Sequence, residues 1–171
     1  MEVADAIELR RSIRRFKKKE IPEGMLKQVL RAGHMAPSAG NLQARDFIII
    51  QDNAVKEFLC MAALNQYFIM GAPACIVVCA NVSRSTARYM KRGELYAVQD
   101  ASAAVMNMML MAHDLGLGTC WVGAFNEQAV TEMLSIPSGV RPVALLPIGY
   151  PDDEPDMPPR MGEATEHWGK W

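Results

Sequence analysis

The sequence lacks the common signatures of metal, nucleotide and nucleic-acid binding. Its four cysteines form no CxxC pattern and its three histidines form no HxxxH or HxH pair, so no metal site is indicated. Neither GxxxxGK[ST] nor GxSxG occurs, and the glycines of GLGTCWVG follow a predicted helix and lead into a strand, the reverse of a dinucleotide-binding turn. With 18 Lys and Arg against 19 Asp and Glu, the chain has no basic excess of the kind that a dedicated nucleic-acid binder carries.

Long hydrophobic runs are absent as well. The most apolar stretch, 101–112, is well short of a membrane span, and the first residues, MEVADAIELRR, have no apolar core of a secretory signal. We therefore expect a cytoplasmic protein that does not bind membranes. Half of the 171 residues are hydrophobic, which suits one compact domain over 1–171, with the proline-rich 151–171 as an extended tail.

What is present is an alternation of helical and strand patterns. Apolar periodicity, capping residues and Gly or Pro stops predict the following helices and strands. The helices are expected at 2–12, 22–36, 52–63, 94–115 and 126–136, and the strands at 46–51, 74–81, 119–124 and 141–151. This order predicts a three-layer α+β or α/β arrangement.

Two hydrophobic segments carry further expectations. Cys75 and Cys79 lie four residues apart in the strand 74–81, roughly 13 Å, which is too far for a disulfide and favours buried structural thiols. The helix 94–115 is apolar on every side in its C-terminal half, which predicts burial on every side. We interpret it as packing against a second copy of the chain, with a central core helix in a monomer as the alternative.

The run RRSIRRFKKK, residues 10–19, concentrates seven of the basic side chains. Arg10, Arg11, Ser12 and Arg14 are suited to the oxygens of a phosphate, because guanidinium forks bind phosphate in a bidentate manner. Cations are also favourable at a helix C-terminus without any ligand, so both interpretations remain open here. We interpret Lys17–Lys19 as a solvated turn.

Two polar segments lie between hydrophobic elements. Residues 36–43, APSAGNLQ, offer backbone N–H groups, a hydroxyl and two amides for a polar heterocycle, although such a segment is also typical of a plain loop. In 121–124, WVGA, the glycine permits close approach of a flat ligand, and a tight strand exit is the alternative.

Taken together and in this order, these segments resemble the FMN-dependent nitroreductase family. The resemblance rests on Arg10-Arg11-Ser12-Ile13-Arg14, the PSxxNxQ loop at 37–43, the polar pair Asn65-Gln66, the long helix 94–115, the segment 118–123, and Pro158-Pro159-Arg160. It covers about residues 3–160. It implies an α+β three-layer α-β-α sandwich with a mainly antiparallel central sheet and a long central helix, in an intertwined homodimer.

The resemblance also implies the site. Arg10, Arg11 and Arg160, assisted by Ser12, would neutralise the FMN phosphate, and Arg14 would lie at the N1/O2 edge where negative charge develops on reduction. The other subunit would supply four side chains, and further residues would line the flavin. These are Pro37, Ser38, Asn41 and Gln43 from the other subunit, and Asn65, Gln66, Trp121, Val122, Gly123 and Ala124. No side chain is expected to be catalytic, because NADH or NADPH would deliver hydride to flavin N5 and a small-molecule acceptor would take it in a ping-pong scheme.

One departure from the family and several alternatives remain open. Many relatives carry Pro-Trp after the loop Gln, where this chain has Ala44-Arg45. The reduction of nitroaromatics, quinones or similar electrophiles is the leading hypothesis. Alternatives are a dehalogenase or flavin-fragmenting enzyme of the same fold, a flavin-binding protein without turnover, or a nucleic-acid-binding module using residues 10–19.

Overall fold

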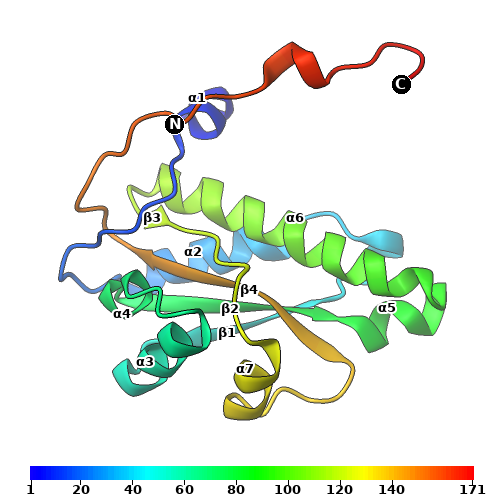
Figure 1. Cartoon of the computed structure of the whole chain (residues 1–171), viewed down its shortest axis with the longest axis horizontal. Helices are drawn as coiled ribbons and strands as arrows, with labels where there is room; N and C mark the ends of the chain where they lie inside the picture. The colour runs from blue at the N-terminus through cyan, green and yellow to red at the C-terminus, as the bar shows by residue number, and fades with distance from the viewer.

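The computed structural model describes residues 1–171 and is built around one antiparallel sheet (Figure 1). Its four strands lie in the order β1-β2-β4-β3. They are β1 (Arg45–Ile50), β2 (Ala74–Asn81), β3 (Gly118–Thr119) and β4 (Val140–Gly149). Every residue of β2 except Asn81 is buried, since this central strand is covered on both faces. The continuous apolar run ACIVVCAN had predicted this strand to the residue.

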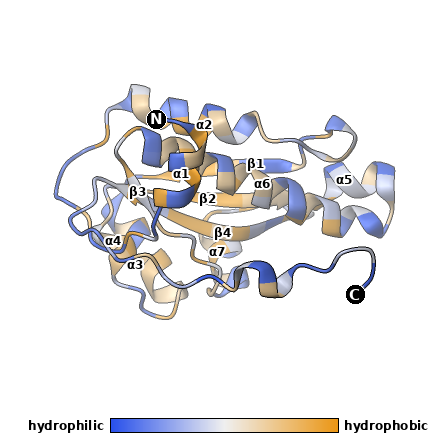
Figure 2. Ribbon diagram, turned by 90° about the horizontal axis from the view of Figure 1, so that it is seen from above, coloured by the Kyte–Doolittle hydropathy of each residue, from blue (hydrophilic) through white to orange (hydrophobic).

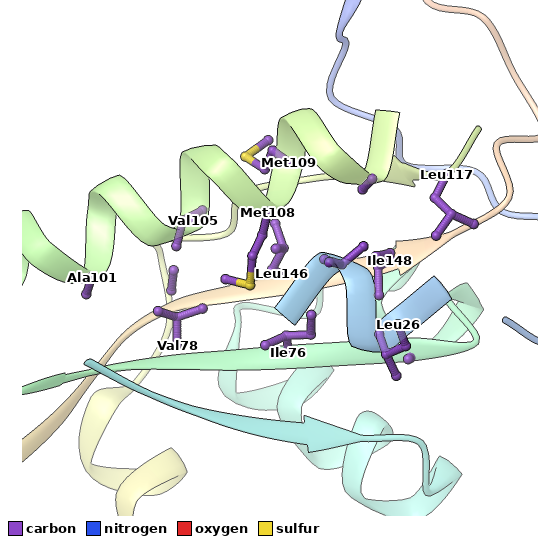
Figure 3. Packing of buried hydrophobic residues seen from close by; sticks show 14 of the residues in the cluster. Leu26, Ile76, Val78, Ala101, Val105, Met108, Met109, Leu117, Leu146 and Ile148 are labelled. Carbon is purple, nitrogen blue, oxygen red and sulfur yellow. The ribbon is translucent and has the colours of Figure 1, made fainter. Parts of the chain in front are cut away.

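One face of the sheet is covered by α2 (Glu23–His34) and α6 (Arg92–Asp114). Val105 and Met108 of α6 lie against Ile76, Val78 and Leu146 of the sheet in one continuous hydrophobic cluster (Figure 3). Gly33 lets α2 approach α6 closely, because a Cβ at this position would meet the Met108 side chain at 2.9 Å. Helix α5 (Val82–Tyr89) packs beside the N-terminal end of α6.

The opposite face is covered by three shorter helices, α3 (Asn53–Ala62), α4 (Phe68–Gly71) and α7 (Glu127–Met133). They enclose a second cluster that includes Leu59, Ile69 and Val130. The side chain of Asp52 caps α3 by accepting from the N–H of Val55, and that of Asn126 caps α7 by accepting from Ala129. The three-layer arrangement with an antiparallel sheet is therefore confirmed.

The long helix is not buried on every side within one chain, so its expected burial on every side would need a second copy and stays a prediction. Met106 keeps 37% of its surface exposed. Leu110 and Met111 line an open groove of about 530 Å³ between α1 (Val3–Leu9), α2 and α6. Met106, Leu110 and Met111 therefore keep part of their apolar surface uncovered within the chain.

The two ends of the chain lie apart, and the N-terminus lies near the C-terminal end of α6 (Figures 1 and 2). The terminal ammonium of Met1 contacts Asp114 at 2.9 Å. The tail leaves the sheet at Gly149 and runs outward, with one 3-10 turn, η2 (Gly162–Thr165), before two fully exposed tryptophans, Trp168 and Trp171 (Figures 1 and 2). None of the helices combines the length and hydropathy that crossing a bilayer requires.

Candidate functional site

The arginine half of the basic run, residues 10–14, is attached to the short edge strand β3. Ser12 bridges Thr119 in parallel, and the N–H of Ile13 donates to the Thr119 carbonyl at 2.9 Å. The Ile13 side chain lies directly over Gly118, where an added Cβ would come within 2.5 Å of it. Glycine at 118 is thus the residue that allows this segment to lie against the strand.

The arginines converge on one cavity. Arg10, Arg11, Ser12 and Arg14 line a space of about 350 Å³, which the tail closes with Arg160. The remaining lining residues are Pro155, Asp156 and Pro158. The lining thus contains four arginines and a single carboxylate, so it is predominantly positive. The structure brings together the four residues that were expected at the phosphate, Arg10, Arg11, Ser12 and Arg160, with Arg14, which was expected at the flavin edge.

The guanidinium of Arg10 is in an unfavourable environment in this cavity. Its Nη1 is buried and has no hydrogen-bond partner. Burial lowers the pKa of Arg10 below its ordinary value, and the neighbouring Arg160 and Arg11 lower it further. A buried cation without a partner is unfavourable, and an anion with several oxygens would satisfy it. The donor set therefore fits the phosphate of FMN.

Arg14 lines this cavity and also lies near α4. Its guanidinium lies 5.8 Å from the ring centroid of Phe68, the first residue of α4. The Cys120 thiol lies beside Arg14, Arg10 and Ser12; burial raises the pKa of this thiol, while the arginines oppose that shift. Neither Phe68 nor Cys120 was predicted, because a one-turn helix has no periodic pattern and the cysteine was interpreted only as a structural thiol.

The predicted pair 65–66 and the segment 121–124 meet on the α3 side of the sheet. The side-chain amide of Gln66 donates to the carbonyls of Ala63 at 3.0 Å and Ala124 at 3.3 Å. Asn65 precedes it in the left-handed region, at φ 59°. These contacts hold the two segments together.

The four residues of 121–124 differ in how far they are exposed to a ligand. Val122 is buried, and both its N–H and its carbonyl pair with Leu145 at 2.9 Å. Trp121 is 39% exposed, and Gly123 and Ala124 are exposed. A ligand on this surface would therefore meet Trp121, Gly123 and Ala124, while Val122 anchors the segment to β4.

The loop 37–43 lies far from the arginine cavity. It carries the predicted site residues Pro37, Ser38, Asn41 and Gln43. It rests on Asp100, which accepts from the N–H of Ala39 at 3.0 Å. The arginine cavity lies by the other end of α6, where His113 adjoins Arg10 and Arg11. Thirteen helical residues separate Asp100 from His113, or about 20 Å. One chain therefore does not bring this loop to the arginines.

The lysine half of the run is separate from both. Lys17, Lys18 and Lys19 are exposed and line another cavity of about 480 Å³ that includes the buried Lys56. The Nζ of Lys56 donates to the Ala72 carbonyl at 2.7 Å, and Lys19 lies 3.9 Å from the ring centroid of Tyr150. These contacts are internal to the chain.

Comparisons with known proteins agree with this arrangement. The chain is 31% identical over 175 residues to a Methanothermobacter thermautotrophicus protein provisionally named NADH dehydrogenase/NAD(P)H nitroreductase, covering 100% of this chain and 88% of that one. It is 30% identical over 181 residues to the FMN reductase [NAD(P)H] of Bacillus subtilis, covering 97% and 73%. Among solved structures, Bacillus megaterium NfrA2 superimposes with a TM-score of 0.93 at 27% identity, covering 100% of this chain and 76% of that chain.

The family model described as the nitroreductase family matches residues 7–63 and 56–150, which hold the arginine segment, the loop 37–43 and the whole sheet. A match of this extent, together with the relatives above, shows that the chain belongs to the nitroreductase family.

Proposed function

We propose that this protein is an FMN-dependent oxidoreductase that uses NADH or NADPH to reduce nitroaromatics, quinones or similar electrophiles. The observation that carries the proposal is the arginine cavity, which four arginines line and in which Arg10 Nη1 is buried without a partner. Family membership supports a flavin as the source of the anion, and names among the relatives include an NADPH-flavin oxidoreductase of Vibrio harveyi. Residues 1–171 would act as a single flavin-binding unit.

The chain's own residues would hold and tune the cofactor. Arg10, Arg11 and Arg160 would bind the phosphate, and the Ser12 hydroxyl would donate to one of its oxygens. Arg14 would place a fixed positive charge at the edge of the flavin where negative charge accumulates, which lowers the energy of the reduced form. When bound, FMN supplies hydride transfer between the nicotinamide and the acceptor.

No protein side chain is assigned as an acid or base. Trp121, Gly123 and Ala124 would form one wall of the site, and Gln66, bonded to the Ala124 carbonyl, would keep that wall in place. Exposed backbone at Gly123 permits close approach of a flat ring. Donor and acceptor would use the same open surface in turn, so the chain needs no second nucleotide motif.

A second copy of the chain would complete the site. Two observations support this part of the proposal: the outer face of α6 leaves Met106 exposed, and the loop 37–43 lies about 20 Å along α6 from the arginines. A homodimer that buries the outer face of α6 could place the loop of one subunit against the flavin of the other. Sedimentation of the purified protein should give a dimer, and a monomer that binds FMN with full activity would contradict this part alone.

The decisive experiment is an anaerobic titration of the FMN-loaded protein with NADH and with NADPH. The purified protein should be yellow or become so with added FMN, and either nucleotide should bleach its visible absorbance. Added quinone should then restore the colour. A protein that takes up no FMN would contradict the proposal, whereas one that binds FMN but is not bleached would be a flavin-binding protein without turnover.

A further inference from the structure

The loop between α2 and β1 rests on two buried charged side chains, Arg45 and Asp100. They are 3% and 4% exposed, although neither residue lies in the arginine cavity. Charged side chains are rarely buried to this extent unless they are hydrogen-bonded. What they bond to is the backbone of this loop.

Arg45 bonds the incoming end of the loop. Its Nη2 donates to the carbonyls of His34 at 2.7 Å and Ala36 at 2.9 Å, and its Nη1 donates to that of Pro37 at 3.4 Å. The carbonyls at the C-terminal end of a helix have no partners within the helix, and a cation there is favourable. The guanidinium thus fixes the direction in which the chain leaves α2.

Asp100, from the middle of α6, bonds the other side of the loop. Its Oδ1 accepts from the N–H of Ala39 at 3.0 Å and its Oδ2 accepts from that of Ala44 at 3.2 Å. Asp100 is not in an ion pair with Arg45. The two groups bond different parts of the loop, Arg45 its carbonyls and Asp100 its amides.

The backbone between these contacts is in an unusual conformation. Gly40, Asn41 and Gln43 are all in the left-handed region, at φ 56°, 55° and 51°. Such positions persist only where surrounding contacts determine them, particularly for residues other than glycine. With the inner side of the loop bonded to Arg45 and Asp100, the side chains of Pro37, Asn41 and Gln43 are exposed on its outer side.

We propose that Arg45 and Asp100 are positioning residues for the flavin site: they hold the loop 37–43 in the conformation that presents Ser38, Asn41 and Gln43 to the flavin of a second copy. The inference rests on the proposed function. The contact with Asp100 also needs a residue other than proline at position 44, where many relatives have Pro. A proline at 44 has no N–H, so it could not donate to Asp100.

The test compares Asp100→Asn with Asp52→Asn in the full-length protein. Asp52 is the matched control, because it also accepts a backbone N–H, that of Val55 at 3.0 Å, but caps α3 on the other face of the sheet. In Asp100→Asn, the side-chain NH2 cannot accept, so one loop amide loses its partner. Three measurements are made: hydrogen exchange at the amides of Ala39 and Ala44, the Kd for FMN, and the visible circular dichroism of bound FMN.

We expect Asp100→Asn to speed exchange at the amide that loses its partner, raise the FMN Kd about tenfold and change the dichroism of the flavin. Asp52→Asn should leave all three within twofold of the wild type. Arg45→Lys, which keeps the charge but loses the fork, is the second variant should Asp100→Asn not fold, and should give the same changes to a smaller degree.

The outcomes separate the two proposals. Faster exchange with unchanged Kd and dichroism in the folded variants would overturn the positioning role and leave the flavin function intact. Unchanged exchange would overturn it as well. A wild-type protein that takes up no FMN would remove the proposed function and, with it, this inference.

Discussion

The two halves of the run RRSIRRFKKK carry similar numbers of cations but lie in different environments. Arg10, Arg11 and Arg14 converge with Arg160 on one cavity, and a guanidinium nitrogen there is buried without a partner. Lys17, Lys18 and Lys19 are exposed, and water solvates them. Arg14 and Arg160 are exposed as well, so the difference lies in Arg10 and Arg11, which are half-buried. A partly desolvated cation without a partner, such as Arg10, favours a bound anion, whereas solvated cations do not. Convergence and burial, rather than the number of charges, therefore distinguish a binding segment from a surface segment.

The largest expected effect separates the halves directly. Arg10→Gln should raise the Kd for FMN about ten- to a hundredfold, since it removes charge-assisted hydrogen bonds to a phosphate. Lys18→Gln, with the same change of charge, should stay within twofold. Quenching of flavin fluorescence on binding measures both. Equal weakening by the two variants would mean that the run acts only through its summed charge.

The second prediction concerns two glycines against which the two halves of the run pack. Replacing either glycine by alanine displaces one half without removing any charge. Gly118 and Gly149 face each other across β3 and β4. A Cβ at 118 would meet Ile13 at 2.5 Å, while one at 149 would meet Pro73 at 2.5 Å and Phe16 at 3.0 Å. Each alanine should cost about 1–3 kcal/mol of unfolding free energy by overpacking.

Only Gly118→Ala should also weaken FMN binding, because Ile13 lies between the arginines of the first half. Denaturant unfolding and FMN titration of the same two variants provide the comparison. If Gly149→Ala lost as much FMN affinity as Gly118→Ala, the positions of the two halves would depend on each other, and this prediction would be wrong.

The elements that sequence predicted well are those with a strong local pattern. The strand 74–81 was predicted to the residue, and the helix 94–115 was observed at 92–114, because both are long apolar stretches with clear ends. Helices α4 and α5 were not predicted. The first is a single turn, and the second, VSRSTARY, is polar and buries only Ser85, so neither has an apolar period.

The site was predictable only in part, because its residues are far apart in the sequence and share no local pattern. Arg10 and Arg160 are 150 positions apart in the chain, and no spacing rule joins them; the family resemblance did. Arg45 and Asp100 were not identified, although a carboxylate in the interior of the helix 94–115, next to its apolar half, was a signal that it bonds something inside the fold. What it bonds depends on tertiary contacts between α6 and a loop some sixty residues earlier, which local pattern does not contain.

The third prediction concerns the same variant, Arg10→Gln, which should weaken FMN binding but stabilise the free protein. In the absence of FMN and phosphate, Arg10→Gln should make the protein more stable, because it relieves a buried cation that Arg160 and Arg11 repel. A Tm increase of about 2 °C is expected for a chain of this size. Lys18→Gln should leave Tm unchanged. Calorimetry in a phosphate-free buffer measures this, and a Tm decrease in Arg10→Gln would mean that Arg10 has a stabilising partner in the free protein.

The smallest effect concerns a histidine beside the arginine half. Burial lowers the pKa of His113, and Arg10 and Arg11 lower it further. In the free protein, folding therefore excludes a proton from this ring, so stability should decrease as the pH falls below the unfolded value of about 6.5.

A bound phosphate would offset the two arginines, so FMN should raise the pKa of His113, although burial, the larger cause, would remain. Titration of the ring signals by NMR, with and without FMN, measures this directly and avoids the ionisation of the phosphate itself, whose second pKa is about 6. The increase should persist in Lys18→Gln and disappear in Arg10→Gln, where one of the two cations is missing and FMN binds weakly. If the pKa of His113 were the same with and without saturating FMN, the anion would be held away from Arg10 and Arg11. The contrast between the two halves of the run would then have to be attributed to Arg14 and Arg160.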